Sequence, residues 1–292
     1  MYQYYIYGVG IHSEIKLYNL EETPSAPDIT VRYSPLPEDI IARTQKGLTS
    51  CISPSRIWFR NEIGHFIIYN GNEILVHPFD GTPEKDLASF VLGWSLSFLF
   101  LLRGYSAIHC SAVEIDKERA AIISGVSGAG KSTTALSLID AGYRYLADDI
   151  LMVQPSPDMW VHPGFPLQKV CRNVAEQINP ANLFYINELK DKFAYYNTED
   201  FCPEPRRLTT MIMLDKHDGD TVLTEEITGF AKWNCVLKNL FLLDAYKIFD
   251  FPPEEKKRSL KIAEKLKIYR ISRPTEKDTV EEIRDIIIKL LQ

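Results

Sequence analysis

Short apolar runs alternate with polar, proline-containing segments over the first 82 residues. Runs rich in β-branched and aromatic side chains, bounded by such segments, predict strands separated by loops. The clearest runs are residues 2–11, 29–33, 56–59, 65–69 and 73–76. The pair Asn70-Gly71 between the last two predicts a two-residue hairpin turn. We therefore expect residues 1–82 to form a β-rich N-terminal lobe.

A long apolar segment follows, and residues 86–103 predict a helix that ends at Gly104. Its apolar part, residues 90–102, is shorter than the ~20 residues that a membrane-spanning helix needs. We expect a helix buried against a sheet and no membrane association. A helix that binds a partner or a second copy of the chain is the alternative.

From residue 107 onward, short apolar strands alternate with segments of helical periodicity. The predicted strands are residues 107–115, 120–123, 143–147, 150–153, 209–214 and 267–271. The predicted helices are residues 133–139, 230–246, 254–266 and the segment that begins at Thr279. Such alternation is typical of an α/β fold. We expect residues 83–292 to form a second, α/β domain with C-terminal helices.

A glycine-rich loop joins the strand at 120–123 to the helix at 133–139. Residues 125–132 read Gly-Val-Ser-Gly-Ala-Gly-Lys-Ser and fit the phosphate-binding pattern G-x-x-x-x-G-K-[ST]. Glycines allow the backbone to wrap around phosphate oxygens, and the N–H groups at the helix start point at the anion. Lys131 can neutralise the β- and γ-phosphates, while the Ser132 hydroxyl can ligate Mg²⁺. The predicted nucleotide-binding residues are Gly125, Ser127, Gly128, Ala129, Gly130, Lys131, Ser132 and Thr133.

Two carboxylates follow the strand at 143–147, as Asp148 and Asp149. A carboxylate at the end of a strand beside the phosphate loop can hold Mg²⁺ or its water shell. With two carboxylates, one can serve the metal while the other takes a proton from an acceptor hydroxyl. A solvated turn is the alternative, but the place of the pair shortly after the glycine loop favours chemistry. His109, on the strand at 107–115, is also expected near this site.

Three stretches together resemble the HPr serine kinase/phosphorylase family. They are His-Cys-Ser-Ala-Val at 109–113, the glycine loop at 125–132, and Ala-Asp-Asp at 147–149. The family's kinase core is similar to the nucleotide-binding core of phosphoenolpyruvate carboxykinase, and it phosphorylates a serine hydroxyl on a small protein. The resemblance implies a P-loop kinase core over residues 83–292.

The resemblance also assigns roles. It implies that Lys131 binds phosphate, that Ser132 and Asp148 serve the metal, and that Asp149 is the general base. His109 would assist Asp149.

The chain departs from the bifunctional members after the aspartate pair. Those members carry a Glu-Ile-Arg-Gly-Leu-Gly signature whose glutamate helps to bind metal, whereas residues 162–169 here read His-Pro-Gly-Phe-Pro-Leu-Gln-Lys. The missing carboxylate argues against the reverse, phosphorolytic reaction. Residues 164–169 and 7–15 instead resemble a kinase-only branch. That branch includes kinases that phosphorylate the C-terminal serine of lasso-peptide precursors.

Basic residues in the half that follows could clamp the γ-phosphate or an acidic substrate end. The candidates are Lys169, Lys192, Arg206 and Arg207. Any one of them could equally be a solvated surface charge. Lys169 is the first choice, because it belongs to the stretch that resembles the peptide-kinase branch. The non-regular segment 154–168 before it could close over a substrate.

Composition narrows the function classes. The 292 residues carry a net charge of −6, which argues against a nucleic-acid binder. Five cysteines are scattered without a C-x-x-C pair, which fits reduced thiols better than a zinc site or a disulfide framework. The N-terminus lacks the pattern of a secretory signal, so we expect a cytoplasmic protein.

The sequence therefore predicts ATP–Mg²⁺-dependent phosphorylation of a serine hydroxyl, with a lasso-peptide precursor as the favoured acceptor. A carrier-protein kinase, a kinase of free serine or another small molecule, and a nucleotide sensor without turnover stay open. The N-terminal lobe either packs on the core or recognises the peptide. A homo-oligomer is expected from the resemblance, because members of the family are commonly oligomeric.

Overall fold

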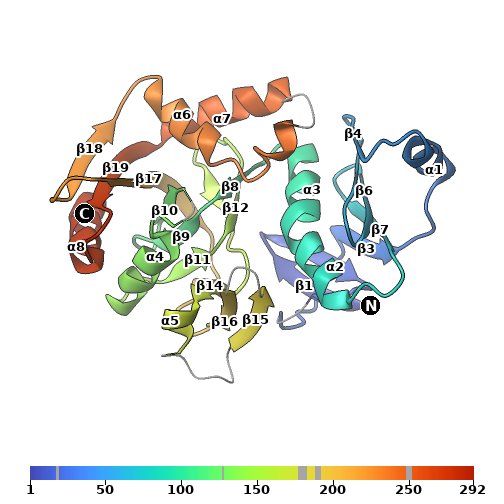
Figure 1. Ribbon diagram of the computed structural model, residues 1–292, viewed down its shortest axis with the longest axis horizontal. Coiled ribbons are helices and arrows are strands. Elements are labelled where there is room, and N and C mark those ends of the chain that lie inside the picture. Colours follow the sequence, from blue (N-terminus) through green and yellow to red (C-terminus); the bar gives the residue numbers. More distant parts are fainter. Residues whose placement is uncertain (18–19, 127, 177–182, 188–191, 248–251) are drawn as a thin grey trace. The chain divides into compact units, whose positions relative to one another are not determined.

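The computed structural model describes residues 1–17, 20–126, 128–176, 183–187, 192–247 and 252–292, and its fold is mixed α/β (Figure 1). The chain divides into two compact units. The first comprises Met1–Ala107 and Leu242–Glu255, and the second comprises Ile108–Phe241 and Lys256–Gln292. The predicted α/β class is confirmed.

The first unit is built on a seven-stranded sheet in the order β1-β2-β3-β7-β6-β5-β4. Its strands are β1 (Tyr2–Ile6), β2 (Val9–Ser13), β3 (Ile29–Tyr33), β4 (Ser50–Ile52), β5 (Arg56–Arg60), β6 (Gly64–Tyr69) and β7 (Glu73–Pro78). The predicted hairpin between β6 and β7 is present, with Asn70 and Gly71 at φ 47° and 70°, but its loop also includes Asn72 and is one residue longer than the predicted two-residue turn. The single strand predicted over residues 2–11 is wrong. Tyr7 and Gly8, at φ 52° and 76°, turn the chain back there into the antiparallel pair β1–β2.

The predicted apolar helix exists, with one irregularity. Helices α2 (Glu84–Phe90) and α3 (Leu96–Leu102) are joined by a π-helical turn, Val91–Ser95. Within the described residues this one helix, Glu84–Leu102, is long and apolar enough to span a membrane by length and composition. The helix packs on the N-terminal sheet through aromatic rings. The ring centroids of Phe59 and Phe98 are 5.6 Å apart, and those of Phe66 and Phe90 are 5.8 Å apart.

These aromatic contacts explain where the units divide. The sequence placed the boundary after residue 82, which assigned the apolar helix to the second domain. The compact division falls after Ala107 instead. The helix therefore completes the core of the first unit. A short helix of that unit, α1 (Glu38–Gln45), was not predicted.

The second unit has a central sheet in the order β11-β9-β10-β17-β19-β18, with β13 also paired to β17. Its strands are β9 (Ser111–Glu114), β10 (Arg119–Gly125), β11 (Tyr145–Ala147), β13 (Trp160–Val161), β17 (Arg206–His217), β18 (Leu223–Ile227) and β19 (Lys267–Pro274). Strands β10, β17 and β19 are parallel. Strand β11 runs the same way, because both β10 and β11 are antiparallel to β9. The carboxyl ends of these four strands therefore meet at one edge of the sheet.

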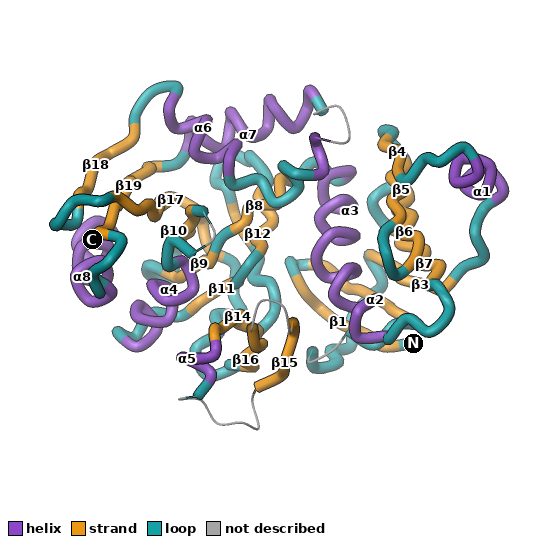
Figure 2. The backbone as a smooth tube through the Cα atoms, viewed as in Figure 1, coloured by secondary structure: helices purple, strands orange, loops and turns teal. Residues whose placement is uncertain are grey.

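Helices cover both faces of this sheet (Figure 2). Alternate residues of β10 point to opposite faces, as the two-residue period of a strand requires. Ala121 and Ile123 belong to a core that includes side chains of α4 (Lys131–Asp140) and α8 (Val280–Leu291). Ala120 and Ile122 belong to a second core, with side chains of α6 (Ala231–Lys238) and α7 (Pro253–Lys265). The continuous apolar runs in the sequence reflect this burial on both faces.

Smaller elements complete the fold. A three-stranded antiparallel sheet contains β14 (Leu167–Cys171), β16 (Lys192–Tyr196) and β15 (Leu183–Asn187), in that order. Helix α5 (Arg172–Ala175) directly follows β14 in the chain. Strands β8 (Ser106–His109) and β12 (Ile150–Val153) form a two-stranded pair. The helix predicted over 230–246 is interrupted, since α6 ends at Lys238 and a 3₁₀ turn, η3 (Ala245–Lys247), follows later.

Candidate active site

The glycine loop and the aspartate pair, two of the predicted motifs, lie at the edge where the parallel strands end. The glycine loop follows β10, and the aspartate pair follows β11. Crevices at the carboxyl ends of strands are the usual ligand sites of α/β sheets. The fold therefore brings two motifs that are distant in sequence to one place.

Three glycines of the loop have backbone conformations that favour glycine. Gly125, Gly128 and Gly130 have φ values of 146°, 78° and 110°, which side chains other than glycine rarely adopt. A Cβ atom on Gly125 would lie 2.3 Å from the carbonyl oxygen of Leu214. Helix α4 starts directly after Gly130, with no capping side chain and no acidic residue in its first turn. No side chain of the first turn therefore caps the N–H groups at the start of α4 or neutralises the positive end of its dipole.

The side chain of Lys131 folds back over the loop. Its ammonium group donates to the carbonyl oxygens of Gly125 and Val126, at 2.9 and 3.4 Å. Ser132 is half-buried and Thr133 is exposed at the start of α4, and Ala129 is buried in the loop. Ser127 lies outside the described residues.

Asp148 is held by two donors. The Ser111 hydroxyl donates to one carboxylate oxygen at 2.5 Å, and the backbone N–H of Lys169 donates to the other at 2.7 Å. Burial raises the pKa of Asp148, and the two hydrogen bonds oppose that rise. Each carboxylate oxygen keeps a second lone pair for another partner. Ser111 had no role in the sequence prediction, although it lies inside the 109–113 motif.

Asp149 occupies an unusual backbone conformation, at φ 78°. For a residue with a side chain this conformation costs ~1–3 kcal/mol, and although Asp adopts it in turns more readily than most residues, residues held in it also cluster at functional sites. Its carboxylate accepts from the Lys169 ammonium at 2.6 Å, and its other carboxylate oxygen lies 3.4 Å from Nδ1 of His109. Lys169 therefore contacts both aspartates, one through its backbone and one through its side chain.

His109 is tied to the same turn. Its Nδ1 lies 3.0 Å from the carbonyl oxygen of Asp149, and since a carbonyl only accepts, Nδ1 carries the proton. Burial lowers the pKa of His109, the nearby Asp149 opposes this, and Lys131 and Lys169 lower the pKa further. The imidazole is thus within the electrostatic reach of both lysines and of the carboxylate.

A buried asparagine connects the glycine loop to its surroundings. The side-chain oxygen of Asn239 accepts from the N–H of Gly125 at 3.2 Å, and its amide donates to the carbonyl of Cys235 at 2.7 Å. The backbone carbonyl of Asn239 accepts from the N–H of His109 at 2.8 Å. Asn239 therefore fixes the start of the loop and His109 to the end of α6. Nothing in its local sequence indicated this role.

Two of the predicted clamp residues lie far from the loop. Arg207 pairs with Arg119 in the β10–β17 register, whereas the glycine loop begins where Gly125 pairs with Leu214. That interval is ~20 Å at the rise of a strand. Arg207 contacts Glu118 near the surface, at 3.4 Å.

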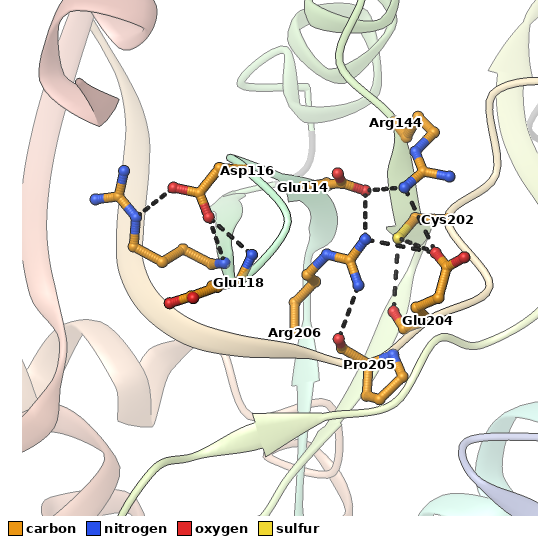
Figure 3. A network of polar contacts seen from close by, with 9 residues as sticks. Glu114, Asp116, Glu118, Arg144, Cys202, Glu204, Pro205 and Arg206 are labelled. Carbon is orange, nitrogen blue, oxygen red and sulfur yellow. Dashed lines mark hydrogen bonds and ion pairs between the residues drawn. The ribbon is translucent and has the colours of Figure 1, made fainter.

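The neighbouring Arg206 is buried in a polar network (Figure 3). Its guanidinium contacts Glu114 at 3.2 Å and Glu204 at 3.4 Å, and Arg144 contacts the same two carboxylates. The prediction of a phosphate clamp at Arg206 and Arg207 is therefore wrong, because both lie at the amino end of β17. Lys192 lies on β16, opposite Cys171, and its side chain is outside the described part of the structure.

Two basic residues near the loop were missed. Lys216 and Arg273 lie at the carboxyl ends of β17 and β19 and are register partners. The guanidinium Nε of Arg273 donates to the carbonyl of Ala129 at 3.1 Å. Each stands just beyond the end of a predicted strand, but the strand order that puts them beside the loop is not visible in the sequence.

The donors at this edge suit Mg²⁺ bound together with phosphate. Within the described ranges, no group of three or more His, Cys, Asp or Glu side chains could hold a metal by itself. Mg²⁺ prefers hard oxygen ligands and usually binds through one or two carboxylates plus substrate phosphates. The Asp148 carboxylate and the Ser132 hydroxyl are such ligands, so the residues fit this ion.

Comparison with known proteins adds a distant likeness. No protein-family model and no curated protein matches the chain. Among solved structures, the chain is similar to the Hpr(Ser) kinase/phosphatase from Coxiella burnetii, at 15% sequence identity and a TM-score of 0.33. The match covers 63% of this chain and 93% of that one. A likeness at this score shows neither the family nor the function of this chain.

Proposed function

We propose that this protein is an ATP–Mg²⁺-dependent kinase that phosphorylates a serine hydroxyl on a small peptide. One observation carries the proposal. A single sheet edge holds a glycine loop with Lys131, an aspartate pair, and Lys169, which bridges that pair. Phosphoryl transfer needs these parts, since catalysis rests on positioning and on stabilising negative charge.

The glycine loop would bind the phosphates of ATP. The N–H groups of the loop and of the first turn of α4 supply donors, and Lys131 supplies a positive charge. In the structure Lys131 donates to loop carbonyls at 2.9 and 3.4 Å, so it already lies over the space that the loop encloses. Ser132 and Asp148 would hold Mg²⁺, which neutralises charge on the β- and γ-phosphates when it is bound.

Asp149 is the proposed general base. It would orient the acceptor hydroxyl and take its proton as the hydroxyl oxygen bonds to the γ-phosphorus and the bond from that phosphorus to the β–γ bridging oxygen breaks. ADP and the phosphoserine are the products. Lys169 would turn from Asp149 toward the γ-phosphate, and His109 would hold the Asp149 turn through its Nδ1–H.

The acceptor is proposed to be the C-terminal serine of a ribosomal peptide precursor, as in lasso-peptide pathways. This choice rests on the resemblance of residues 164–169 and 7–15 to the peptide-kinase branch. The position of that first stretch supports it. The N–H of Gly164 donates to the carbonyl of Leu146 at 2.8 Å, and Lys169 contacts both aspartates. A kinase of a carrier protein or of free serine would have the same nucleotide-binding residues and would differ only in its acceptor pocket.

The cytoplasmic location, the absence of nucleic-acid and membrane partners, and a homo-oligomer stay predictions. The net charge of −6 supports the absence of a nucleic-acid partner, since a nucleic-acid binder shows a basic surface.

The test is mass spectrometry of the protein with Mg²⁺–ATP and three acceptors: a serine-ended precursor peptide, an HPr-type carrier protein, and free serine. We expect one added phosphate on the peptide, and none with Lys131→Ala. Transfer to the carrier or to free serine would keep the reaction and replace the acceptor. Nucleotide binding without transfer to any of the three would favour a sensor.

A further inference from the structure

The two sides of the glycine loop differ in charge. In the sheet order β11-β9-β10-β17-β19, the strand that leads to Asp148 and Asp149 lies on one side of β10. The strands that end in Lys216 and Arg273 lie on the other side. The loop therefore separates a carboxylate side from a cationic side.

Lys216 and Arg273 are direct partners in the parallel β17–β19 register. Both lie against the glycine loop. A Cβ atom on Gly128 would be 3.8 Å from the Lys216 ammonium, and one on Gly130 would be 3.8 Å from Nε of Arg273. Like charges directly opposite each other on paired strands are destabilising. An anion bound between the loop and these two side chains would relieve that repulsion.

The two cations differ in how they are held. Arg273 is half-buried, and its guanidinium donates to the carbonyls of Ala129 and Pro274, both at 3.1 Å. Lys216 is exposed, and among the described residues its ammonium has no hydrogen-bond or ion-pair partner, while its backbone N–H donates to Asp215. Arg273 thus positions the loop, and Lys216 is available to a ligand.

We propose that Lys216 binds the nucleoside-proximal phosphates of the donor, those that ATP and ADP share, with Arg273 as the positioning residue beneath the loop. This inference rests on the proposed function, in which the loop binds a nucleotide. The transferred γ-phosphate must face Asp149 and Lys169 on the carboxylate side. A phosphate chain that crosses the loop then places its remaining phosphates toward Lys216.

Calorimetric titration with ADP and with the non-hydrolysed ATP analogue AMPPNP, both with Mg²⁺, tests this assignment. We expect Lys216→Ala to raise the Kd of both nucleotides by the same factor, ~10-fold, as for the loss of one partly solvated charge-assisted hydrogen bond. The difference in Kd between Lys216→Ala and the wild type should become smaller at high salt, because salt screens an exposed charge. Lys216→Arg should restore most of the affinity.

Lys277→Ala is the matched control, since Lys277 is an exposed lysine that pairs with Asp220 at 3.2 Å and, among the described residues, has no hydrogen bond or ion pair to the loop. It should leave both Kd values unchanged. Unchanged ADP binding in Lys216→Ala would overturn the inference, as would a loss confined to AMPPNP or a wild-type protein that binds neither nucleotide. If Lys216→Ala binds ADP more weakly and the wild-type protein phosphorylates no acceptor, this inference is supported while the proposed function fails.

Discussion

Replacing Lys169 with Met removes the ammonium that contacts Asp149 and keeps most of the apolar stem. The ion pair is 2.6 Å long, but its side chains are 41% and 24% exposed. Pairs with this exposure contribute ~0.2–1 kcal/mol to folding. The backbone hydrogen bond from residue 169 to Asp148 does not depend on the side chain. We therefore expect the free energy of unfolding of Lys169→Met to change by less than ~1 kcal/mol.

The effect on transfer should be much larger. If Lys169 stabilises charge on the transferring γ-phosphate, its loss should lower kcat by ~10²–10³-fold, as for one preorganised donor in other enzymes. The Kd of ADP should stay within ~2-fold of the wild-type value, because ADP lacks the γ-phosphate. The assay is a steady-state measurement of phosphate transfer to the accepted peptide, with ADP titration beside it.

Arg207→Met provides the matched control. Arg207 is also a partly exposed base from the half of the chain that follows the aspartates, yet it contacts Glu118 at the far end of β17. Its replacement should leave kcat within ~2-fold, as for surface substitutions away from the site. An unchanged kcat in Lys169→Met, or equal losses in both variants, would refute the role given to Lys169.

Three further predictions concern the loop, the core and pH. Gly125→Ala should lower the free energy of unfolding by more than ~2 kcal/mol and abolish ADP binding. Residue 125 has a φ of 146°, and its new Cβ would lie 2.3 Å from the Leu214 carbonyl oxygen. Thermal unfolding measures the first effect and calorimetry the second. Arg206→Met should cost ~2–4 kcal/mol of stability, since it leaves Glu114, 12% exposed, with one fewer partner, while ADP binding to the folded protein is unchanged. Burial lowers the pKa of His65 to about 4, from an ordinary value of 6.5, so the neutral form is favoured in the fold. The contribution of neutral His65 to the free energy of unfolding is therefore complete above pH 6.5 and is lost as the pH falls toward 4, by up to ~3 kcal/mol. Denaturant unfolding of His65→Gln should show a correspondingly smaller loss of stability over that pH interval.

Local signals predicted local structure well. The hairpin at Asn70-Gly71, the apolar helix, and the strand–loop–helix around the glycine loop depend on neighbouring residues, and the structure contains all three, although the hairpin loop is one residue longer than predicted. The Tyr7-Gly8 turn was missed, because tyrosine is not a residue that signals a left-handed turn and the apolar run continues through it.

The candidate site was only partly visible in the sequence. Lys131, Asp148 and Asp149 belong to contiguous motifs, so they could be named in advance. Lys216 and Arg273 could not, because their place beside the loop depends on which strands pair and in which register. Lys169, Arg206 and Arg207 also look alike in the sequence, since all three are basic and lie near the start of a strand. The fold distinguishes them, because the start of β14, with Lys169, lies beside the aspartates, whereas the start of β17, with the two arginines, does not.

Asp149 is the proposed general base, which takes the proton from an acceptor hydroxyl. The most direct test compares wild type with Asp149→Asn in phosphate transfer to the serine-ended peptide, measured by mass spectrometry, with ADP titration as the control. We predict a fall in transfer of ~10²–10⁴-fold, the contribution of a general base, with ADP binding retained. Transfer at the wild-type rate in Asp149→Asn would contradict the mechanism.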